Sequence, residues 1–288
     1  MDEDDIFAQL ANINLDNAPV VTAPQEQQQI ENVVEEINYI NSPTLCQAAD
    51  SSQRFKGADW FDIMKHTTVS IIGAGGIGSW TIYAFARANV GCMVVYDGDT
   101  VSSTNMAGQL YRLSDVGKPK VSALYDICKD YVPTVNMIGH NNFYNNQPLT
   151  PITITALDSM TARKLVYENW KKQFSNVKEE DKWKYLFVDG RMSAENFQIF
   201  CFRLSDKESM KIYEEEALFD SSKATPAPCT FRATTFVGMG IGGNIFALVK
   251  NHVYLANRGS LFKDNVELYN EYDSTMGIKL IKNKEFKL

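Results

Sequence analysis

The stretch TTVSIIGAGGIG, residues 67–78, decides the fold class of this chain. Its first six residues form a largely β-branched, apolar run, and a G-x-G-x-x-G turn follows directly from Gly73 to Gly78. The mostly apolar segment that continues to Val90 is predicted to be a helix. This order of strand, glycine-rich turn and helix is typical of a nucleotide-binding α/β unit, because a helix N-terminus offers free N–H groups and a positive dipole end to a phosphate.

The glycines of this turn are the residues expected to bind phosphate. Gly73 permits the tight turn, Gly75 lets a phosphate approach the backbone, and Gly78 lets the helix pack closely on the strand. The predicted phosphate-binding set is Gly73, Gly75, Gly76 and Gly78.

A second buried strand is predicted at residues 92–96, and it ends at Asp97. Asp97 follows Gly78 by 19 residues, close to the spacing at which a carboxylate in such units accepts the ribose hydroxyls. The turn and Asp97 together predict an adenine nucleotide. They do not decide between NAD, FAD and ATP.

The alternation of strands and helices continues along the chain. Helices are predicted at residues 118–131 and 159–174, and strands at residues 135–139, 152–157 and 185–188. This pattern predicts an α/β fold with a Rossmann-like, doubly wound and mostly parallel sheet. After Gly190 we expect an antiparallel C-terminal extension, with a strand at 197–204, a helix at about 238–254 and a short final strand pair.

Acidic residues are concentrated at the N-terminus of the chain of 288 residues. Residues 1–53 hold ten Asp and Glu and no Lys or Arg, whereas the rest holds 28 Lys and Arg against 25 Asp and Glu, a net charge of +3. Residues 1–50 are predicted to be a flexible acidic tail. Residues 51–288 are predicted to be one domain, with a nucleotide-binding half at about 65–190 and a substrate-facing half at about 191–288. The near-neutral body does not favour nucleic-acid binding.

Hydropathy and cysteine spacing indicate the cellular compartment and argue against a zinc site. No run approaches the roughly 18 apolar residues of a membrane span, and the first residues carry no basic leader. The widely spaced cysteines predict neither a disulfide framework nor a zinc site, so a cytoplasmic protein is expected. Core packing is the expected role of Cys92, Cys128 and Cys201, and no ligand or proton-transfer role is expected for His66, His140 and His252.

Four motifs downstream of the turn resemble one superfamily in register. Residues 97–101, with Asn105, Gln109 and the segment 117–120, resemble the signature D-x-D-x-V…N…RQ…G…K. Asp158 with Arg163 resembles a later D-N-x-x-x-R motif. These are signatures of ubiquitin-activating enzymes and ThiF-type adenylyltransferases, and the resemblance extends over residues 54–163. It implies a compact ThiF-like adenylation fold that binds ATP and Mg²⁺.

The resemblance also implies roles for individual residues. Asp97 and Asp99 belong to the nucleotide site, with Asp97 on the ribose, and Asn105 and Gln109 contact the phosphates. Lys120 neutralises the pyrophosphate and Asp158 coordinates Mg²⁺ as a hard oxygen ligand. Arg54 resembles an upstream arginine that reaches the ATP of a partner subunit, which implies a homodimer whose active sites are shared.

Three positions leave the function open. Gly108 stands where the family has an arginine, so one phosphate-binding cation is missing unless Arg112 or Lys118 replaces it. Cys229, in P-C-T-F-R, resembles the thioester-forming cysteine of eukaryotic activating enzymes, although small members of the superfamily keep a similar segment for fold closure. Arg191 is a candidate for the substrate carboxylate or for a structural ion pair.

These observations leave several hypotheses. The first is an ATP-dependent adenylyltransferase that activates the C-terminal carboxylate of a ubiquitin-like or sulfur-carrier protein or of a peptide, with or without thioester transfer to Cys229. The alternative is a nucleotide-binding pseudoenzyme that recruits a partner through its acidic tail. An NAD-dependent dehydrogenase rests on the glycine motif alone and leaves Asn105, Lys120 and Asp158 unexplained.

Overall fold

A computed structural model of the chain describes residues 55–193, 196–219, 234–257, 271–275 and 278–280. The chain divides into two units, residues 1–50 and 51–288, and every described residue lies in the second. Cys229 and Arg54 lie outside the described residues.

The described strands form one sheet in the order β3-β2-β1-β4-β5-β6-β7-β8. The strands β3, β2, β1, β4 and β5 run parallel to one another. The strands β6, β7 and β8 follow, each antiparallel to the strand before it. The strand bounds are β1 Thr68–Ile72, β2 Cys92–Tyr96, β3 Met137–His140, β4 Ile152–Thr155, β5 Leu186–Ser193, β6 Asn196–Arg203, β7 Glu271–Thr275 and β8 Ile278–Leu280. The predicted doubly wound sheet with an antiparallel extension is confirmed.

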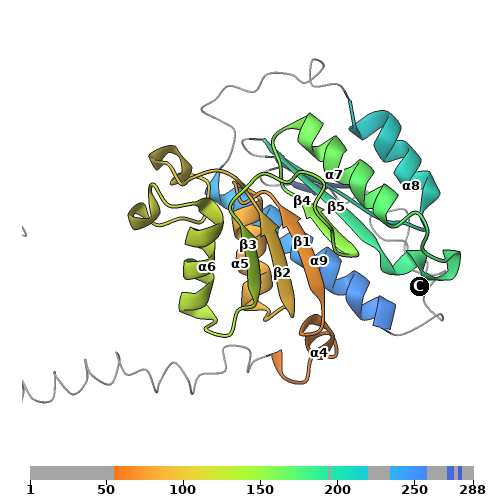
Figure 1. Cartoon of the computed structure of the whole chain (residues 1–288), viewed down its shortest axis with the longest axis horizontal. Helices are drawn as coiled ribbons and strands as arrows, with labels where there is room; N and C mark the ends of the chain where they lie inside the picture. The colour runs from red at the N-terminus through yellow and green to blue at the C-terminus, as the bar shows by residue number, and fades with distance from the viewer. Residues whose placement is uncertain (1–54, 194–195, 220–233, 258–270, 276–277, 281–288) are drawn as a thin grey trace, which may run out of the picture. The chain divides into compact units, whose positions relative to one another are not determined.

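Helices cover both faces of this sheet (Figure 1). The helix bounds are α4 Phe61–Met64, α5 Gly78–Arg87, α6 Lys120–Tyr131, α7 Met160–Gln173, α8 Lys207–Ile212 and α9 Thr235–Asn257. Successive strand residues point to opposite faces, so two cores form. Val69 and Ile71 of β1 pack with α5, α6 and α9, whereas Ile72 packs with α7 and α8.

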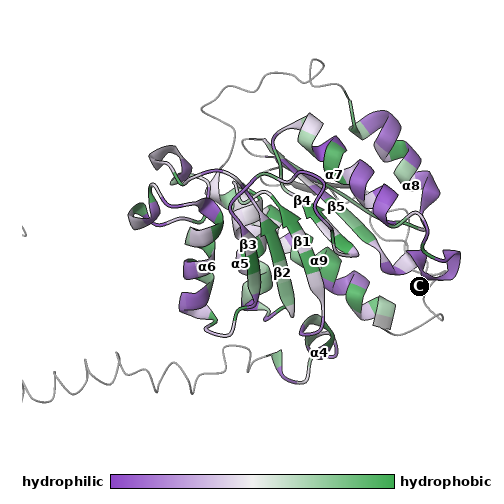
Figure 2. Cartoon of the chain, viewed as in Figure 1, coloured by the Kyte–Doolittle hydropathy of each residue, from purple (hydrophilic) through white to green (hydrophobic). Residues whose placement is uncertain are grey.

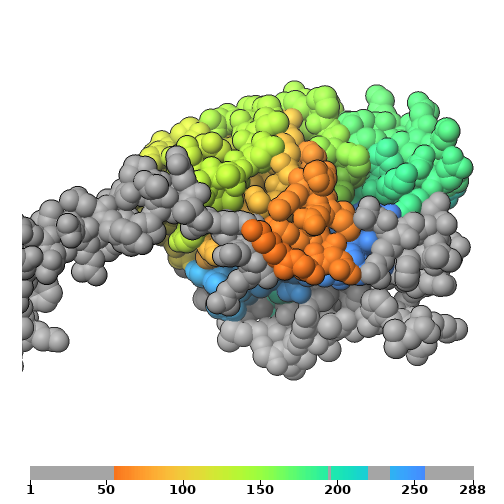
Figure 3. Space-filling view, turned by 90° about the horizontal axis from the view of Figure 1, so that it is seen from below, coloured from red at the N-terminus to blue at the C-terminus, as the bar shows by residue number. Residues whose placement is uncertain are grey.

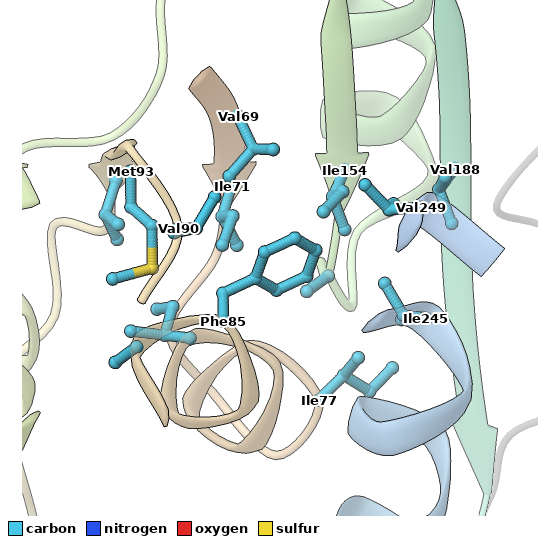
Figure 4. Close-up of a cluster of buried hydrophobic side chains, with 14 of the residues drawn as sticks. Val69, Ile71, Ile77, Phe85, Val90, Met93, Ile154, Val188, Ile245 and Val249 are labelled. Carbon is cyan, nitrogen blue, oxygen red and sulfur yellow. The ribbon is translucent and has the colours of Figure 1, made fainter. Parts of the chain in front are cut away.

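The first core lies between the parallel strands and α5 (Figure 4). Phe85 of α5 is fully buried and points toward the strands that carry Ile71 and Ile154. Hydrophobic residues concentrate on the strands, whereas the outer sides of α6, α7 and α8 are hydrophilic (Figure 2). Burial of this apolar surface is the main favourable contribution to the stability of the fold.

Helix α9 packs directly on α5 through small residues. A Cβ atom on Gly238 would lie 2.6 Å from the Trp80 ring, and one on Gly242 would lie 2.8 Å from the Trp80 backbone. Near the middle of α9, Phe246 meets Trp60, which precedes α4, with ring centroids 6.1 Å apart. Figure 3 shows α4 and α9 side by side at the surface. The helix begins at Thr235, three residues before the predicted start.

The strand order reverses direction at β1, because the chain moves to β2 on one side and later to β4 on the other. Ligands of open α/β sheets bind at this switch point, beyond the carboxyl ends of the strands. One register level there joins His140, Tyr96, Ile72, Thr155 and Asp189 across the sheet. Among the described residues, no helix is long and apolar enough to cross a membrane.

Candidate functional site

The glycine turn after β1 allows only glycine at its two ends. Gly73 has a φ of +100°, and a Cβ atom there would lie 2.5 Å from the carbonyl oxygen of Ala156. A Cβ atom on Gly78 would overlap the carbonyl oxygen of Gly73. Gly75 has no described atom within 4 Å of such a position, so its backbone faces open space beside the N-terminus of α5. This is the geometry that phosphate binding requires.

Asp97 joins the end of β2 to this turn. Its carboxylate accepts hydrogen bonds from the N–H of Ala74 at 2.7 Å and of Asp99 at 2.8 Å. The side chain is buried, and burial raises the pKa of Asp97 above its usual value even though these two backbone N–H groups lower it. Each carboxylate oxygen still has a free lone pair, so the group can accept a further donor such as a ribose hydroxyl.

Lys120, the first residue of α6, lies against the same segment. Its ammonium donates to Asp99 Oδ2 at 2.8 Å, and its N–H donates to the Asp99 carbonyl at 2.9 Å. The side chain of Lys120 is 8% exposed, whereas that of Asp99 is 52% exposed. The cation is therefore held by a carboxylate that faces solvent, close to the Asp97 end of the site.

The loop between β2 and α6 is fixed mostly by its own backbone. Asn105 Oδ1 accepts from the Ser102 N–H at 2.8 Å, and the Asn105 carbonyl accepts from the Gln109 N–H at 3.0 Å. Within the described residues, Gln109 Oε1 is buried without a hydrogen-bond partner. A phosphate oxygen cannot satisfy an acceptor, so the predicted phosphate contact of Gln109 would have to come from its amide NH₂.

The same loop is anchored to the glycine turn and to α5. Tyr111 donates to the Ala74 carbonyl at 2.6 Å, and Trp80 Nε1 donates to the Gly108 carbonyl at 3.1 Å. Burial, followed by the nearby carboxylates, raises the pKa of Tyr111, so its hydroxyl stays protonated. These two hydrogen bonds hold the loop next to the glycine turn and α5, and neither of them involves a side chain at residue 108.

Neither cation near Gly108 is free to replace the missing arginine. Arg112 donates to both oxygens of Asp115, at 2.9 and 3.2 Å, and to Asp130 at 2.6 Å. Lys118 donates to Asp115 at 2.9 Å. Burial of Asp115 opposes ionisation, but the hydrogen bonds from Arg112 and Lys118 outweigh it and lower the pKa of Asp115 to about 2. Both cations thus stabilise a buried carboxylate of the protein itself.

Asp158 follows β4 beside the glycine turn. A Cβ atom on Gly73 would lie 3.3 Å from the Leu157 side chain, so the residue before Asp158 packs on the turn. Asp158 is exposed and has no hydrogen-bond or ion-pair partner in the described part of the chain. Arg163 is buried and donates to the Leu157 carbonyl, which fixes the backbone that carries Asp158.

A buried polar network continues from Arg163 to β5, and sequence reasoning missed its centre. Asp189 is fully buried and accepts from Arg163, from Thr155 at 2.7 Å, from Arg191 at 2.8 Å and from Tyr213 at 3.0 Å. Asp189 and Arg191 are two residues apart in one strand, and residues at that spacing share a face. Opposite charges at that spacing were the signal that could have identified the pair.

Arg191 is held by its ion pair with Asp189, but part of its guanidinium has no partner among the described residues. Its guanidinium lies over the Phe200 ring at 4.6 Å, and its Nη2 is buried with no hydrogen-bond partner among the described residues. A buried donor without a partner costs free energy unless a ligand or water completes it. The ion pair and the free Nη2 leave both sequence interpretations of Arg191 open.

The described cysteines are Cys92, Cys128 and Cys201. Burial raises the pKa of Cys92, and it raises the pKa of Cys128 and of Cys201 to about 12, so the thiols stay protonated. Cys128 and Cys201 are fully buried in the first core, which agrees with their predicted packing role. No group of three or more His, Cys, Asp and Glu that could hold a metal occurs among the described residues.

A family model matches most of the chain. The model of the ThiF family covers residues 50–278. This chain belongs to the ThiF family. The superfamily resemblance drawn from the motifs around Asp97, Lys120 and Asp158 is thereby confirmed.

Curated relatives of this ThiF-family protein match over limited segments. The tRNA threonylcarbamoyladenosine dehydratase of Bacillus subtilis (strain 168) is 36% identical over 92 residues, which are 32% of this chain and 36% of that protein. The adenylyltransferase and sulfurtransferase uba4 of Aspergillus niger is 36% identical over 78 residues, 27% of this chain and 16% of that protein. The NEDD8-activating enzyme E1 catalytic subunit of Caenorhabditis elegans is 30% identical over 119 residues, which are 38% of this chain and 27% of that protein. Each match thus spans about a third or less of the relative.

Solved structures share the fold of this ThiF-family protein at low identity. PaaA has a TM-score of 0.57 at 16% identity and covers 100% of this chain and 84% of its own. TcdA of E. coli in complex with ATP has a TM-score of 0.53 at 17% identity, over 76% of this chain and 99% of its own. MccB of E. coli with MccA-N7isoASN has a TM-score of 0.56 at 15% identity, over 79% of this chain and 67% of its own.

Proposed function

We propose that this ThiF-family protein is an ATP-dependent adenylyltransferase that activates the C-terminal carboxylate of a ubiquitin-like or sulfur-carrier protein or of a peptide. The observation that carries the proposal is the contact between three segments at one edge of the sheet. The glycine turn is hydrogen-bonded to Asp97, Asp97 accepts from the backbone of the residue that holds Lys120, and the segment before Asp158 packs on Gly73.

The reaction needs this set of groups. A carboxylate oxygen attacks the α-phosphorus of ATP, an acyl–phosphate bond forms, and the bond to the β-phosphate breaks so that pyrophosphate leaves. The glycine turn binds the triphosphate through backbone N–H groups, and Asp97 accepts the ribose hydroxyls. Lys120 neutralises the charge that develops on pyrophosphate, and Asn105 and Gln109 orient the phosphates.

The donor set around Asp158 fits Mg²⁺. Magnesium usually keeps several waters and is bound by one or two carboxylates together with substrate phosphates, so a single exposed carboxylate beside the phosphate turn is sufficient. Bound there, the ion would neutralise phosphate charge as a Lewis acid. The hydrogen bond from Arg163 to the Leu157 carbonyl holds the backbone next to Asp158.

The remaining assignments belong to the same proposal. Arg191 offers its unpartnered Nη2 to the incoming carboxylate, supported by the Asp189 ion pair. Arg54 completes the site of a partner subunit in a homodimer, and Cys229 either receives the acyl group as a thioester or serves fold closure. We also propose a cytoplasmic location, which the free thiols of the described Cys92, Cys128 and Cys201 support. We keep the proposed division into an acidic tail at 1–50 and one adenylation domain at 51–288.

The direct test is exchange of labelled pyrophosphate into ATP by the full chain with candidate carriers. We expect the exchange to need a carrier and to fall by about a hundredfold or more in Asp158→Ala, because the metal ligand is lost. The matched control is Asp62→Ala on α4, where the carboxylate is 89% exposed and forms a long contact of 3.9 Å with Lys65. Unchanged exchange in Asp158→Ala would contradict the assigned metal role.

One observation favours the pseudoenzyme as a second candidate. Gly108 supplies no cation, and Arg112 and Lys118 are both committed to Asp115. On this interpretation Mg-ATP raises the melting temperature, whereas no carrier supports pyrophosphate exchange. Removal of residues 1–50 would then abolish partner capture but leave nucleotide binding intact.

A further inference from the structure

A large aromatic side chain stands exposed beside the candidate nucleotide site. Phe143 is 68% exposed, and it follows β3 at the carboxyl edge of the sheet. A Cβ atom on Gly98 would lie 2.8–2.9 Å from three atoms of the Phe143 ring. Gly98 directly follows Asp97, and the Asp97 N–H donates to the His140 carbonyl at 3.2 Å. The ring therefore lies next to the carboxylate that we expect to bind ribose.

The backbone on both sides of Phe143 is fixed. On one side, Asn141 Nδ2 donates to the hydroxyl of Ser122 on α6 at 3.0 Å. On the other side, Tyr144 is buried and meets the Tyr96 ring edge-on, with centroids 5.6 Å apart. The Tyr144 hydroxyl also donates to the Gln147 carbonyl at 2.9 Å. Phe143 is thus held by its neighbours in a position where its own ring gains little burial.

Three features follow one another in strand order. The glycine turn follows β1, Asp97 follows β2, and Phe143 comes after β3, and these strands are neighbours in the sheet. Adjacent strands lie about 4.8 Å apart, so the features succeed one another across one edge. The phosphates, the ribose and the base of a nucleotide are joined in the same order.

We propose that Phe143 is the platform on which the base of the bound nucleotide stacks. The inference rests on the proposed nucleotide site and assigns it a base-binding residue. Every nucleobase has a π face, so an aromatic platform adds affinity for the nucleoside without choosing between bases. Gly98 is needed for the position of Phe143, because any side chain at residue 98 would displace the Phe143 ring.

The test compares the dissociation constants of Mg-ATP, Mg-GTP and Mg-tripolyphosphate by calorimetry for the full chain and for Phe143→Ala. We expect Phe143→Ala to bind ATP and GTP about tenfold more weakly, by the same factor, and tripolyphosphate as well as the wild type does. The matched control is Ile138→Ala, an exposed apolar residue on β3 at 51% exposure, which should leave all three constants unchanged.

A second variant tests the position of the ring. Gly98→Ala should weaken Mg-ATP binding by moving Phe143, and the double variant Gly98→Ala/Phe143→Ala should bind no more weakly than Phe143→Ala alone. Additive losses would contradict this positioning. Unchanged ATP binding by Phe143→Ala, or an equal loss of ATP and tripolyphosphate, would overturn the platform.

The outcomes also separate this inference from the proposed reaction. If the wild type binds Mg-ATP with the expected base dependence but exchanges no pyrophosphate, the platform is supported and the adenylation proposal fails. If exchange occurs and Phe143→Ala binds ATP normally, the platform fails and adenylation stands. A wild-type chain that binds neither ATP nor tripolyphosphate overturns both.

Discussion

At the scale of single residues, Gly108 stands where the family motif has an arginine. Gly108 has no side chain, and its carbonyl accepts a hydrogen bond from Trp80 Nε1 at 3.1 Å. Arg112 and Lys118, which follow Gly108 in the sequence, are both ion-paired with the buried Asp115. The arginine of the family motif is absent at residue 108, and the loop is stabilised by the buried carboxylate of Asp115.

Asp115→Asn should destabilise the protein in a pH-dependent manner. Because its pKa is lowered to about 2 in the folded state, the ionised carboxylate contributes stability above its unfolded pKa near 3.8. That contribution is lost as the pH falls through about 2. We expect a loss of about 1–3 kcal/mol at pH 7, measured by urea unfolding, and a smaller difference at the lowest pH that the fold tolerates. A difference that does not shrink in acid would contradict the ionised state of Asp115.

At the scale of elements, the contact between α5 and α9 positions the glycine turn. A Cβ atom on Gly238 would lie 2.7 Å from the Gly76 carbonyl, so α9 lies against the turn itself. The side chains of Ile241 and Ile245 complete the contact in the first core. Glycine is required on one side of α9 because backbone approaches backbone there.

Two adjacent glycines of α9 should respond to alanine in opposite directions. A Cβ atom on Gly242 would lie 2.8 Å from the Trp80 backbone, so Gly242→Ala should destabilise by about 1–3 kcal/mol through overpacking. Gly243 is exposed and no described atom lies within 4 Å of its Cβ position, so Gly243→Ala should stabilise by up to about 1 kcal/mol through helix propensity. Melting temperatures of the two variants test the packing, and equal shifts would contradict it.

At the scale of the folded domain, one buried network connects elements that are distant in sequence. Asp189 of β5 binds Thr155 of β4, Arg163 of α7 and Tyr213, which follows α8. The network ties the backbone near Asp158 to the strand that carries Arg191. It therefore connects the backbone beside Asp158, the proposed metal ligand, to Arg191, the proposed carboxylate ligand.

Removal of the central carboxylate should be costly for the whole fold. Asp189→Ala leaves the cations Arg163 and Arg191 without their carboxylate, and breaking a buried pair in this way costs about 3–5 kcal/mol. The control is Asp130→Ala, whose carboxylate is 60% exposed in its pair with Arg112 and should cost less than about 1 kcal/mol. Chemical denaturation of both variants compares the two, and similar losses would show that Asp189 is not the centre of the network.

The local sequence determined the elements that form the proposed nucleotide site. The β-branched run before Gly73, the glycine spacing and Asp97 predicted β1, α5 and β2 to within a few residues, because propensity, periodicity and turn chemistry agree there. The strand predicted at 185–188 was too short, since β5 continues to Ser193 by pairing with β6. That pairing is a tertiary contact, and no local pattern in residues 189–193 predicts it.

What only the tertiary structure decided is which polar groups meet. The sequence could place Asp99, Lys120 and Asp158 at strand and helix ends, but the partners of Arg112, Lys118 and Asp189 depend on distances between segments remote in the chain. The position of Phe143 over Gly98 has the same origin. Secondary structure follows from interactions within a few residues, whereas ion pairs and ring contacts are set by how the strands are ordered in the sheet.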